Sequence, residues 1–440
     1  MTAKQWFNWH SLTGVWTGLL LFVICWSGTF ATLSYELDWL TNPAIRASSS
    51  QTPQLSLAEA YQIVSEARPQ DRVAFASAPL APGFNYDIVI ETQAGQWRHL
   101  YVDPVSGVIA GDSSYLNIQR FFRDFHRVLF GAVNRTLASY LVFLLAIPLL
   151  ISVISALYLY RAWWQKFLTL NWSRQRRANV ASLHKLAGVW SLWFSLVIAL
   201  TSVWYLYEAF RVDAIDGKVS LVGQGSYAVQ PLPPLSGAIT EPLPLTELVA
   251  RAQQARPDLQ ITSLWFDSGY LQVHGQAGHL LVRDRANKLY LDPYTGEVVH
   301  NQNASNLSLY WRWSDTADPL HFGDFAGLTS KLIWFVFGLI LSFMALSGSY
   351  MYVKRQQSKR QPLAYRRTLI LAVAGTVLML LASIWAGYQA TLSYGVAGQL
   401  PALPVATTLF LGAWLVLTVA IIVYWCFKLF SVIGYERRSF

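Results

Sequence analysis

The sequence predicts a mainly α-helical membrane protein built as a tandem repeat. Each unit would hold a spanning helix, an extracytoplasmic α+β domain and a second spanning helix. The chain has 440 residues, of which 54% are hydrophobic and 13% charged, a composition typical of membrane proteins. It contains six apolar stretches long enough to cross a hydrocarbon core of about 30 Å. Several short motifs occur twice, in the same order.

The six apolar stretches cover residues 12–33, 137–160, 186–207, 332–353, 368–390 and 403–427. The first is too long for the apolar region of a signal peptide and has no A-x-A cleavage site. We therefore expect all six to span the membrane.

The net charge of +9 is concentrated in two short segments. Residues 161–185 and 354–367 each hold six Lys or Arg and no acid, whereas 36–124 and 208–324 carry more acids than bases. The positive-inside rule then places the short segments and both termini in the cytoplasm, and the long segments in the periplasm. This predicts a multi-pass protein of the inner membrane, in contact with lipid. Such a distribution does not indicate nucleic-acid binding.

Two heptapeptides show the repeat most clearly. HSLTGVW beginning at His10 recurs as HKLAGVW beginning at His184, and YVDPVSG beginning at Tyr101 recurs as YLDPYTG beginning at Tyr290. Both units would enter the membrane from the same side, which predicts a parallel repeat about an axis along the membrane normal. The two spans after Arg367 lie outside the repeat, and we interpret them as a structural or partner-binding hairpin.

The expected organisation has nine parts. Spanning segments cover 1–35, 126–162, 184–208 and 321–355, and the hairpin covers 368–430. The extracytoplasmic domains cover 36–125 and 209–320, and the basic cytoplasmic loops cover 163–183 and 356–367.

Each extracytoplasmic domain has the pattern of a small α+β unit. Amphipathic helices are predicted over 57–67 and 245–255, and strands over 86–91, 98–102 and 271–274. The Asp-Pro-x-Ser/Thr-Gly elements are turn sequences, so we expect Asp103 and Asp292 to be structural. The proline-rich segment 231–244 is predicted to be an extended surface loop.

Four histidines occupy equivalent positions in the two units. His10 and His184 precede the first span of each unit, and His126 and His321 precede the second. Imidazole is the usual protein ligand of haem iron, and two facing imidazoles complete its axial coordination. We therefore predict two bis-histidine haem b sites, His10 with His184 at the cytoplasmic side and His126 with His321 at the outer side. A single interfacial histidine is more often only hydrogen-bonded, so the prediction depends on all four together.

Nearby residues fit these sites to different degrees. Gly14 and Gly188 lie four residues after a histidine, on the same helical face, where a missing side chain would let a flat macrocycle approach the backbone. Arg127 lies beside His126 and is a candidate for binding a haem propionate or an anionic substrate. The alternative is a cation at the level of the lipid headgroups.

The spacing of the outer pair creates a difficulty. His126 and His321 stand eleven residues before their apolar stretches, or about 15 Å beyond the core if the helices are straight. The two sites would then be about 45 Å apart, which is far for a single electron step.

The His-led spans around Tyr-x-Asp-Pro-x-Ser/Thr-Gly elements resemble the PepSY-associated transmembrane family over residues 1–355. The resemblance is to inner-membrane siderophore reductases that bind haem b, and it implies an oxidoreductase that passes electrons to a periplasmic ferric siderophore or another acceptor, reducing Fe(III) to Fe(II). Some relatives carry a fused flavin reductase domain, and this sequence has no such domain. The electron donor would therefore be separate, either a quinol or a cytoplasmic reductase.

Two other classes of function remain open from the residues alone. PepSY-like domains could bind peptide or protein, and the chain would then be a membrane scaffold or sensor. An iron or siderophore permease is less favoured, because the spans lack the charges that transporters usually place there. We see no arrangement of residues for hydrolysis, and no catalytic residue is expected.

Overall fold

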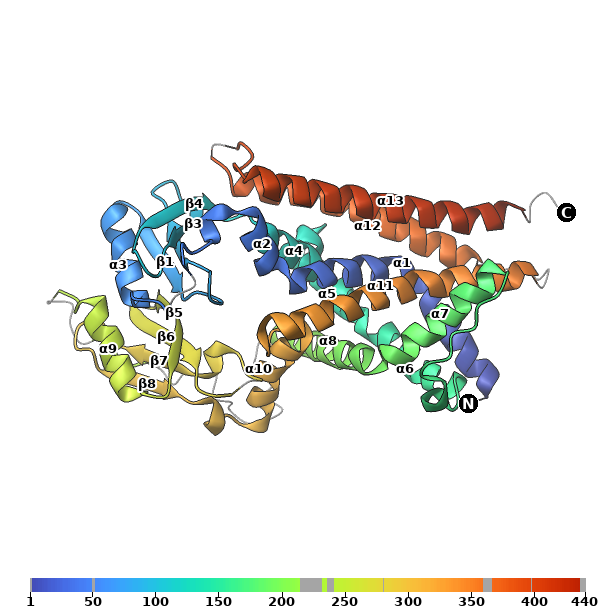
Figure 1. Cartoon of the computed structure of the whole chain (residues 1–440), viewed down its shortest axis with the longest axis horizontal. Coiled ribbons are helices and arrows are strands. Elements are labelled where there is room, and N and C mark those ends of the chain that lie inside the picture. The colour runs from blue at the N-terminus through green and yellow to red at the C-terminus, as the bar shows by residue number, and fades with distance from the viewer. Residues whose placement is uncertain are drawn as a thin grey trace.

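A computed structural model describes residues 2–49, 52–213, 232–235, 241–279, 281–358, 366–396 and 398–435. The molecule is elongated, with a helical bundle at one end and a β-sheet with its covering helices at the other (Figure 1). Both termini lie at the bundle end, away from the sheet. Parts of the proline-rich segment 231–244, and the basic residues Lys359, Arg360, Arg437 and Arg438, lie outside the described residues.

Within the described residues, six apolar helical segments are long enough to cross a membrane, and each overlaps one predicted span. The first, fourth, fifth and sixth are the single helices α1 (Ala3–Thr32), α11 (Gly327–Ser358), α12 (Arg366–Ser393) and α13 (Val405–Tyr435). The second consists of α5 (Arg135–Leu144) and α6 (Ala146–Leu159). The third is α8 (Leu192–Asp213), which follows α7 (Arg176–Trp190) after an interruption at Ser191.

Close approach of α1 and α11 forms the centre of the bundle. A Cβ added to Gly18 would lie 2.5 Å from Ser349 Oγ, and one added to Gly338 would lie 2.4 Å from Thr29 Oγ1. Ser349 Oγ also donates to the Gly14 carbonyl oxygen at 2.7 Å. Small residues that let helix backbones approach are a common basis of packing in membranes.

The outer part of the molecule is one eight-stranded antiparallel sheet with the order β4-β3-β2-β1-β5-β6-β7-β8. Its strands are β1 (Arg72–Ser77), β2 (Tyr86–Glu91), β3 (Trp97–Val102), β4 (Ile109–Ser114), β5 (Gln260–Asp267), β6 (Tyr270–Gln276), β7 (Lys288–Leu291) and β8 (Val298–Gln302). The helices that cover it are α3 (Leu57–Ala67) and α9 (Leu245–Ala255), and both agree with the predicted bounds. The three predicted strands correspond to β2, β3 and β6.

The two halves of the sheet are joined edge to edge. Strand β1 pairs with β5, and Ala76 lies opposite Leu264. One hydrophobic core runs beneath both halves, with Val64 of α3 and Leu248 of α9 in the same buried cluster. The sequence predicted two α+β units but gave no sign of this pairing, because it joins segments that are far apart in the chain.

The repeated Asp-Pro turns have the structural role expected from the sequence. The carboxylate of Asp103 accepts hydrogen bonds from the backbone N–H groups of Val105 and Ser106, and that of Asp292 accepts from Tyr294 and Thr295. Both aspartates are buried. Asx turns of this kind replace backbone hydrogen bonds where the chain reverses.

Candidate functional site

The outer histidines lie on short helices that are separate from the spans. His126 is on α4 (Ile118–Val128) and His321 is on α10 (Leu309–Phe322). The carboxylate of Asp38 accepts from the N–H groups of Ile118 and Gln119 and so caps the start of α4. These two hydrogen bonds help to fix the position of α4.

The chain turns sharply between α4 and the second span. Leu129 and Phe130 have left-handed backbone conformations, with φ of 48° and 55°, which non-glycine residues rarely adopt. Gly323, with φ of 72°, ends α10 in the same way. Because of these turns, α4 and α10 can run in directions different from those of the spans that follow them.

This turn places His126 against α1 rather than beyond the membrane core. His126 Nδ1 lies 3.0 Å from the Ile24 carbonyl oxygen, and a Cβ added to Gly28 would lie 2.6 Å from His126 Cε1. Both α1 residues belong to an apolar helix that could span the membrane. The expectation that the outer histidines stand about 15 Å beyond the apolar stretch is wrong, because it assumed one straight helix.

The structure brings His126 and His321 together. Their ring centroids are 6.2 Å apart, with 41° between the ring planes. Two metal–imidazole bonds of about 2 Å, with about 1 Å from each ligating nitrogen to its ring centre, give a centroid separation of about 6 Å. The observed separation suits a pair of axial ligands to one iron.

The inner histidines are held in a similar way at the other end of the bundle. His10 lies on α1, and its Nδ1 is 2.9 Å from Ser155 Oγ of α6. His184 lies on α7, and its Nδ1 is 2.7 Å from Ser347 Oγ of α11. The two imidazoles are close enough to interact electrostatically.

The hydrogen bonds around the four rings favour one tautomer. Ser155, Ser347, Ser27 and Thr201 each donate their own hydroxyl proton to a carbonyl oxygen three or four residues earlier in the helix. Each hydroxyl oxygen is then left to accept from the Nδ1–H of a histidine, namely His10, His184, His126 and His321 respectively. The Ser27–His126 contact is the longest, at 3.4 Å.

This tautomer leaves Nε2 of each ring with a lone pair. Within the part of the chain that the structure describes, no hydrogen bond engages Nε2 of any of the four. Histidines that bind metals usually donate the other ring N–H to a neighbouring acceptor, which orients the ring and makes it more basic. The arrangement therefore fits four metal ligands that would bind through Nε2.

The hydroxyl partners follow the sequence repeat. Ser27 and Thr201 are separated by 174 residues, the same offset as His10 and His184. In each unit, the first span holds the histidine of the second, and the second span holds the histidine of the first. Sequence reasoning missed these hydroxyls, although the shared offset could have identified Ser27 and Thr201.

The two pairs are closer together than the sequence suggested. On α1, His10 and the carbonyl of Ile24 that receives His126 are fourteen residues apart, or about 21 Å along the helix axis. In the second unit, His184 and Thr201 are seventeen residues apart across the interruption at Ser191, which gives an upper limit of about 25 Å. The expected separation of about 45 Å between the two sites is wrong. It assumed straight helices, whereas the chain bends before the second span of each unit.

The glycines beside the inner pair differ in their surroundings. A Cβ added to Gly14 would meet nothing within 4 Å, and one added to Gly188 would lie 3.5 Å from Met344 Cε. The open space beside Gly14 fits the predicted close approach of a flat macrocycle. At Gly188 the contact is an ordinary one with the flexible end of a methionine.

Three arginines gather beside the outer pair. The guanidinium of Arg127 is within electrostatic range of Arg123, Arg135 and Asp318. Across the described ranges, no carboxylate forms an ion pair with Arg123, Arg127 or Arg135. Lys331 differs, because its Nζ lies 2.7 Å from Glu36 Oε1. The arginines are therefore the better candidates for binding an external anion.

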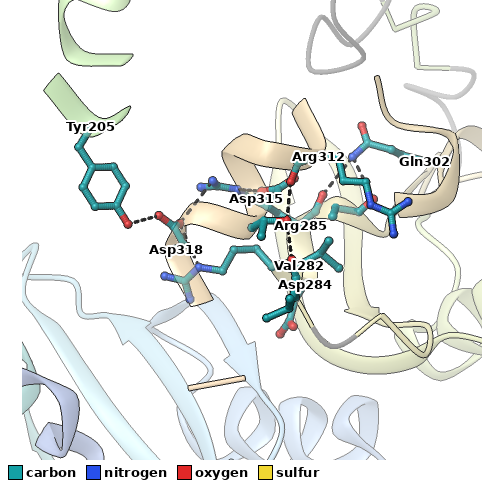
Figure 2. Close-up of polar contacts among 12 residues, drawn as sticks. Tyr205, Val282, Asp284, Arg285, Gln302, Arg312, Asp315 and Asp318 are labelled. Carbon is teal, nitrogen blue, oxygen red and sulfur yellow. Dashed lines mark hydrogen bonds and ion pairs between the residues drawn. The ribbon is translucent and has the colours of Figure 1, made fainter. Parts of the chain in front are cut away.

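A charged network connects the outer pair to the sheet (Figure 2). The ring centroid of Tyr205 is 5.1 Å from that of His321, and its hydroxyl donates to Asp318 at 2.7 Å. Asp318 in turn accepts from Arg283 Nε at 3.0 Å, while Arg285 Nε donates to the buried Asp315 at 2.8 Å. This network fixes α10 against the sheet. It joins residues far apart in the chain, so no local sequence pattern predicts it.

The C-terminal hairpin supports the helix that carries His126. Trp414 of α13 packs against Phe122 of α4, with ring centroids 4.9 Å apart. Tyr394 at the end of α12 donates to Asp124 at 3.2 Å. A Cβ added to Gly387 of α12 would lie 2.8 Å from the ring of Phe130 in the turn. These contacts support a structural role for the hairpin.

Comparison with known proteins gives one family match. The sequence model described as "PepSY-associated TM region" matches residues 7–355, which include all four histidines, both Asp-Pro turns and the first four spans. A comparison with curated proteins gave no match. Because the match covers most of the chain, the protein belongs to the PepSY-associated transmembrane family.

Proposed function

We propose that the protein is a membrane b-type di-haem reductase that carries electrons across the inner membrane to a periplasmic acceptor. The observation that carries this proposal is that all four histidines make the same kind of hydrogen bond. Each has Nδ1 engaged by a hydroxyl of a neighbouring helix, and each has Nε2 available. Imidazoles that are oriented through Nδ1 and paired in this way are typical of metal ligands.

The chain's own residues would do three things for bound haem. His10 with His184, and His126 with His321, would supply the axial nitrogens. The helix hydroxyls would orient the rings and tune their basicity, and Gly14 and Gly188 would leave room beside the inner pair. Bound haem b supplies one-electron chemistry at iron. No residue needs to act as an acid, a base or a nucleophile.

The proposed acceptor is a ferric siderophore, reduced from Fe(III) to Fe(II) so that the iron is released. This part rests on the family resemblance. The arginines Arg123, Arg127 and Arg135 support an anionic group at the outer site, because a cluster of cations attracts anions. That group could be a haem propionate or part of the acceptor. The donor would be a quinol or a separate cytoplasmic reductase.

We also propose that the chain is a parallel tandem repeat with both termini in the cytoplasm. The symmetric strand order of the sheet and the matched hydroxyl partners support the repeat. The basic segments at the bundle end support the orientation. Labelling of cysteines introduced at Ala94 and Arg174 tests it in intact spheroplasts, because only Ala94→Cys should react with an impermeant maleimide. Reaction of only Arg174→Cys would reverse the orientation.

An absorption spectrum of the purified protein tests the function. The proposal predicts a Soret band that shifts on reduction, with sharp visible bands, and reoxidation of the reduced protein by a ferric siderophore. A colourless protein would exclude the reductase and favour the scaffold or the permease. A coloured protein that no ferric siderophore reoxidises would retain the haem assignment and reject the acceptor.

A further inference from the structure

A second site lies at the end of the bundle opposite the sheet. A cavity of about 420 Å³ opens there, lined by residues from α7, α11 and α13. Four of the lining residues are cations, namely Arg176, Arg177, Lys354 and Lys428. No lining residue in the described part of the chain is acidic. The histidine pairs do not line this cavity.

Aromatic side chains of α13 beside the cavity contact two of the cations. Arg176 Nη2 donates to Tyr424 Oη at 3.2 Å. Lys428 Nζ lies 5.5 Å from the centroid of the Tyr424 ring and 5.7 Å from that of Phe427. Tyr350 of α11 completes the wall with a further hydroxyl. The four cations come from three different helices, so an anion bound in the cavity would be attracted by all of them.

The cavity lies where the apolar helices reach the membrane surface. The apolar run of α13 ends at Ser431 and that of α11 at Gln356, and Ser431 is itself a lining residue. On α13, Phe427 is 65% exposed and Val423 is 60% exposed, so apolar surface continues from the cavity toward the bilayer core. Cationic cavities between spanning helices at this level suit phosphate headgroups.

We propose that this cavity binds the phosphate group of an anionic phospholipid. The guanidinium groups of Arg176 and Arg177 would form charge-assisted hydrogen bonds to phosphate oxygens, while Lys354 and Lys428 add positive charge. The acyl chains would lie along the exposed face of α13. The bound lipid would hold α13 to α7 and α11, and so join the C-terminal hairpin to the four spans of the family region.

Lipid competition in nanodiscs tests the proposal. A fluorescent phosphatidylglycerol probe should associate with the wild-type protein about tenfold more strongly than the matching phosphatidylcholine probe. The triple variant Arg176→Gln, Arg177→Gln and Lys428→Gln should lose this preference. A control with Lys4→Gln, Lys166→Gln and Arg174→Gln removes as much charge from the same end, outside the cavity, and should keep it. Equal loss in the control would show only a diffuse surface charge and overturn the site.

Two further measurements cover a triple variant that does not fold and a cavity that binds free phosphate rather than lipid. The single variant Lys428→Gln should weaken the preference several-fold, which provides a test if the triple variant does not fold. Inorganic phosphate added to phosphatidylcholine nanodiscs should not displace the probe at millimolar concentration. Displacement by free phosphate would overturn the lipid assignment, and absence of any preference for the anionic probe would overturn the site itself. None of these outcomes depends on haem.

Discussion

At the scale of single residues, the hydroxyl groups beside the histidines are as informative as the histidines. Ser347 donates its proton to the Met344 carbonyl and is thereby restricted to accepting from His184 Nδ1. Such a partner fixes both the tautomer and the direction of the ring. The four histidines could be predicted from sequence because they recur at matched positions. Of their hydroxyl partners, only Ser27 and Thr201 carry a signal, the repeat offset of 174 residues. Ser155 and Ser347 carry none, because serine and threonine are common in spans and bond equally well to their own helix.

Replacement of Ser347 by Ala should weaken haem retention at the inner site about 10- to 100-fold. The reason is that His184 would lose the acceptor that orients its ring. Transfer of haem to apomyoglobin measures this retention. Ser342→Ala is the matched control, since Ser342 is buried on the same helix and donates to the Gly338 carbonyl. Equal haem loss from both variants would argue that Ser347 acts only through helix packing.

Gly14 allows a test that separates cofactor space from protein packing. A Cβ at this position would meet no protein atom within 4 Å, so Gly14→Ala should leave the thermal stability of the haem-free protein within about 0.5 kcal/mol of wild type or above it. If a macrocycle lies there, the same variant should bind less haem at the inner site. Haem titration and thermal unfolding of the apoprotein measure the two effects. Normal haem binding by Gly14→Ala would place the macrocycle elsewhere.

At the scale of elements, the bend between α4 and α5 determines where the outer pair lies. Periodicity and hydropathy located every span, but neither detects left-handed backbone at Leu129 and Phe130, which tertiary packing enforces. The pairing of β1 with β5 was missed for a similar reason, since it joins residues almost two hundred positions apart. Local signals, such as the amphipathic pattern of α3 and the Asp-Pro turns, were sufficient where the structure itself is local.

The C-terminal hairpin should influence the outer haem site through α4. Trp414 is 4% exposed and packs on Phe122, so Trp414→Ala should cost about 3–5 kcal/mol of local packing and speed haem loss from the His126–His321 pair. Trp385→Ala is the control, because Trp385 of α12 is 65% exposed. Resonance Raman spectra of the two variants would show whether the outer ligation changes. An unchanged spectrum in Trp414→Ala would show that the hairpin does not influence ligation at the His126–His321 pair.

The Asp103 turn should make the sheet sensitive to acid. Burial alone would raise the pKa of Asp103, but N–H groups of Ser106, Ser48 and Val105 hold that pKa well below its ordinary value. A carboxyl group with a lowered pKa contributes stability above its unfolded pKa of about 4, and this contribution is lost as the pH falls through the folded value.

Asp103→Asn should therefore be less stable than wild type at pH 6, and the difference should shrink at pH 3. Thermal unfolding at the two pH values measures it. Glu66→Gln, at an exposed site on α3, should show little effect at either pH. A difference for Asp103→Asn that grew on acidification would contradict the assignment of a lowered pKa.

At the scale of the whole molecule, one bundle holds two histidine pairs beneath a shared sheet. The register of α1 places the pairs about 21 Å apart along the bundle. The sheet lies at the end of the bundle where α4 and α10 are found (Figure 1), and these helices carry His126 and His321. The central claim is that each pair binds one haem through two axial imidazoles. Everything proposed about electron transfer depends on it.

A pyridine haemochromogen assay on purified wild type, His10→Ala and His321→Ala tests that claim most directly. The account predicts two haem b per chain in the wild type and one in each variant, because each substitution removes a ligand from a different pair. A haem-free wild type, or an unchanged haem content in both variants, would contradict it.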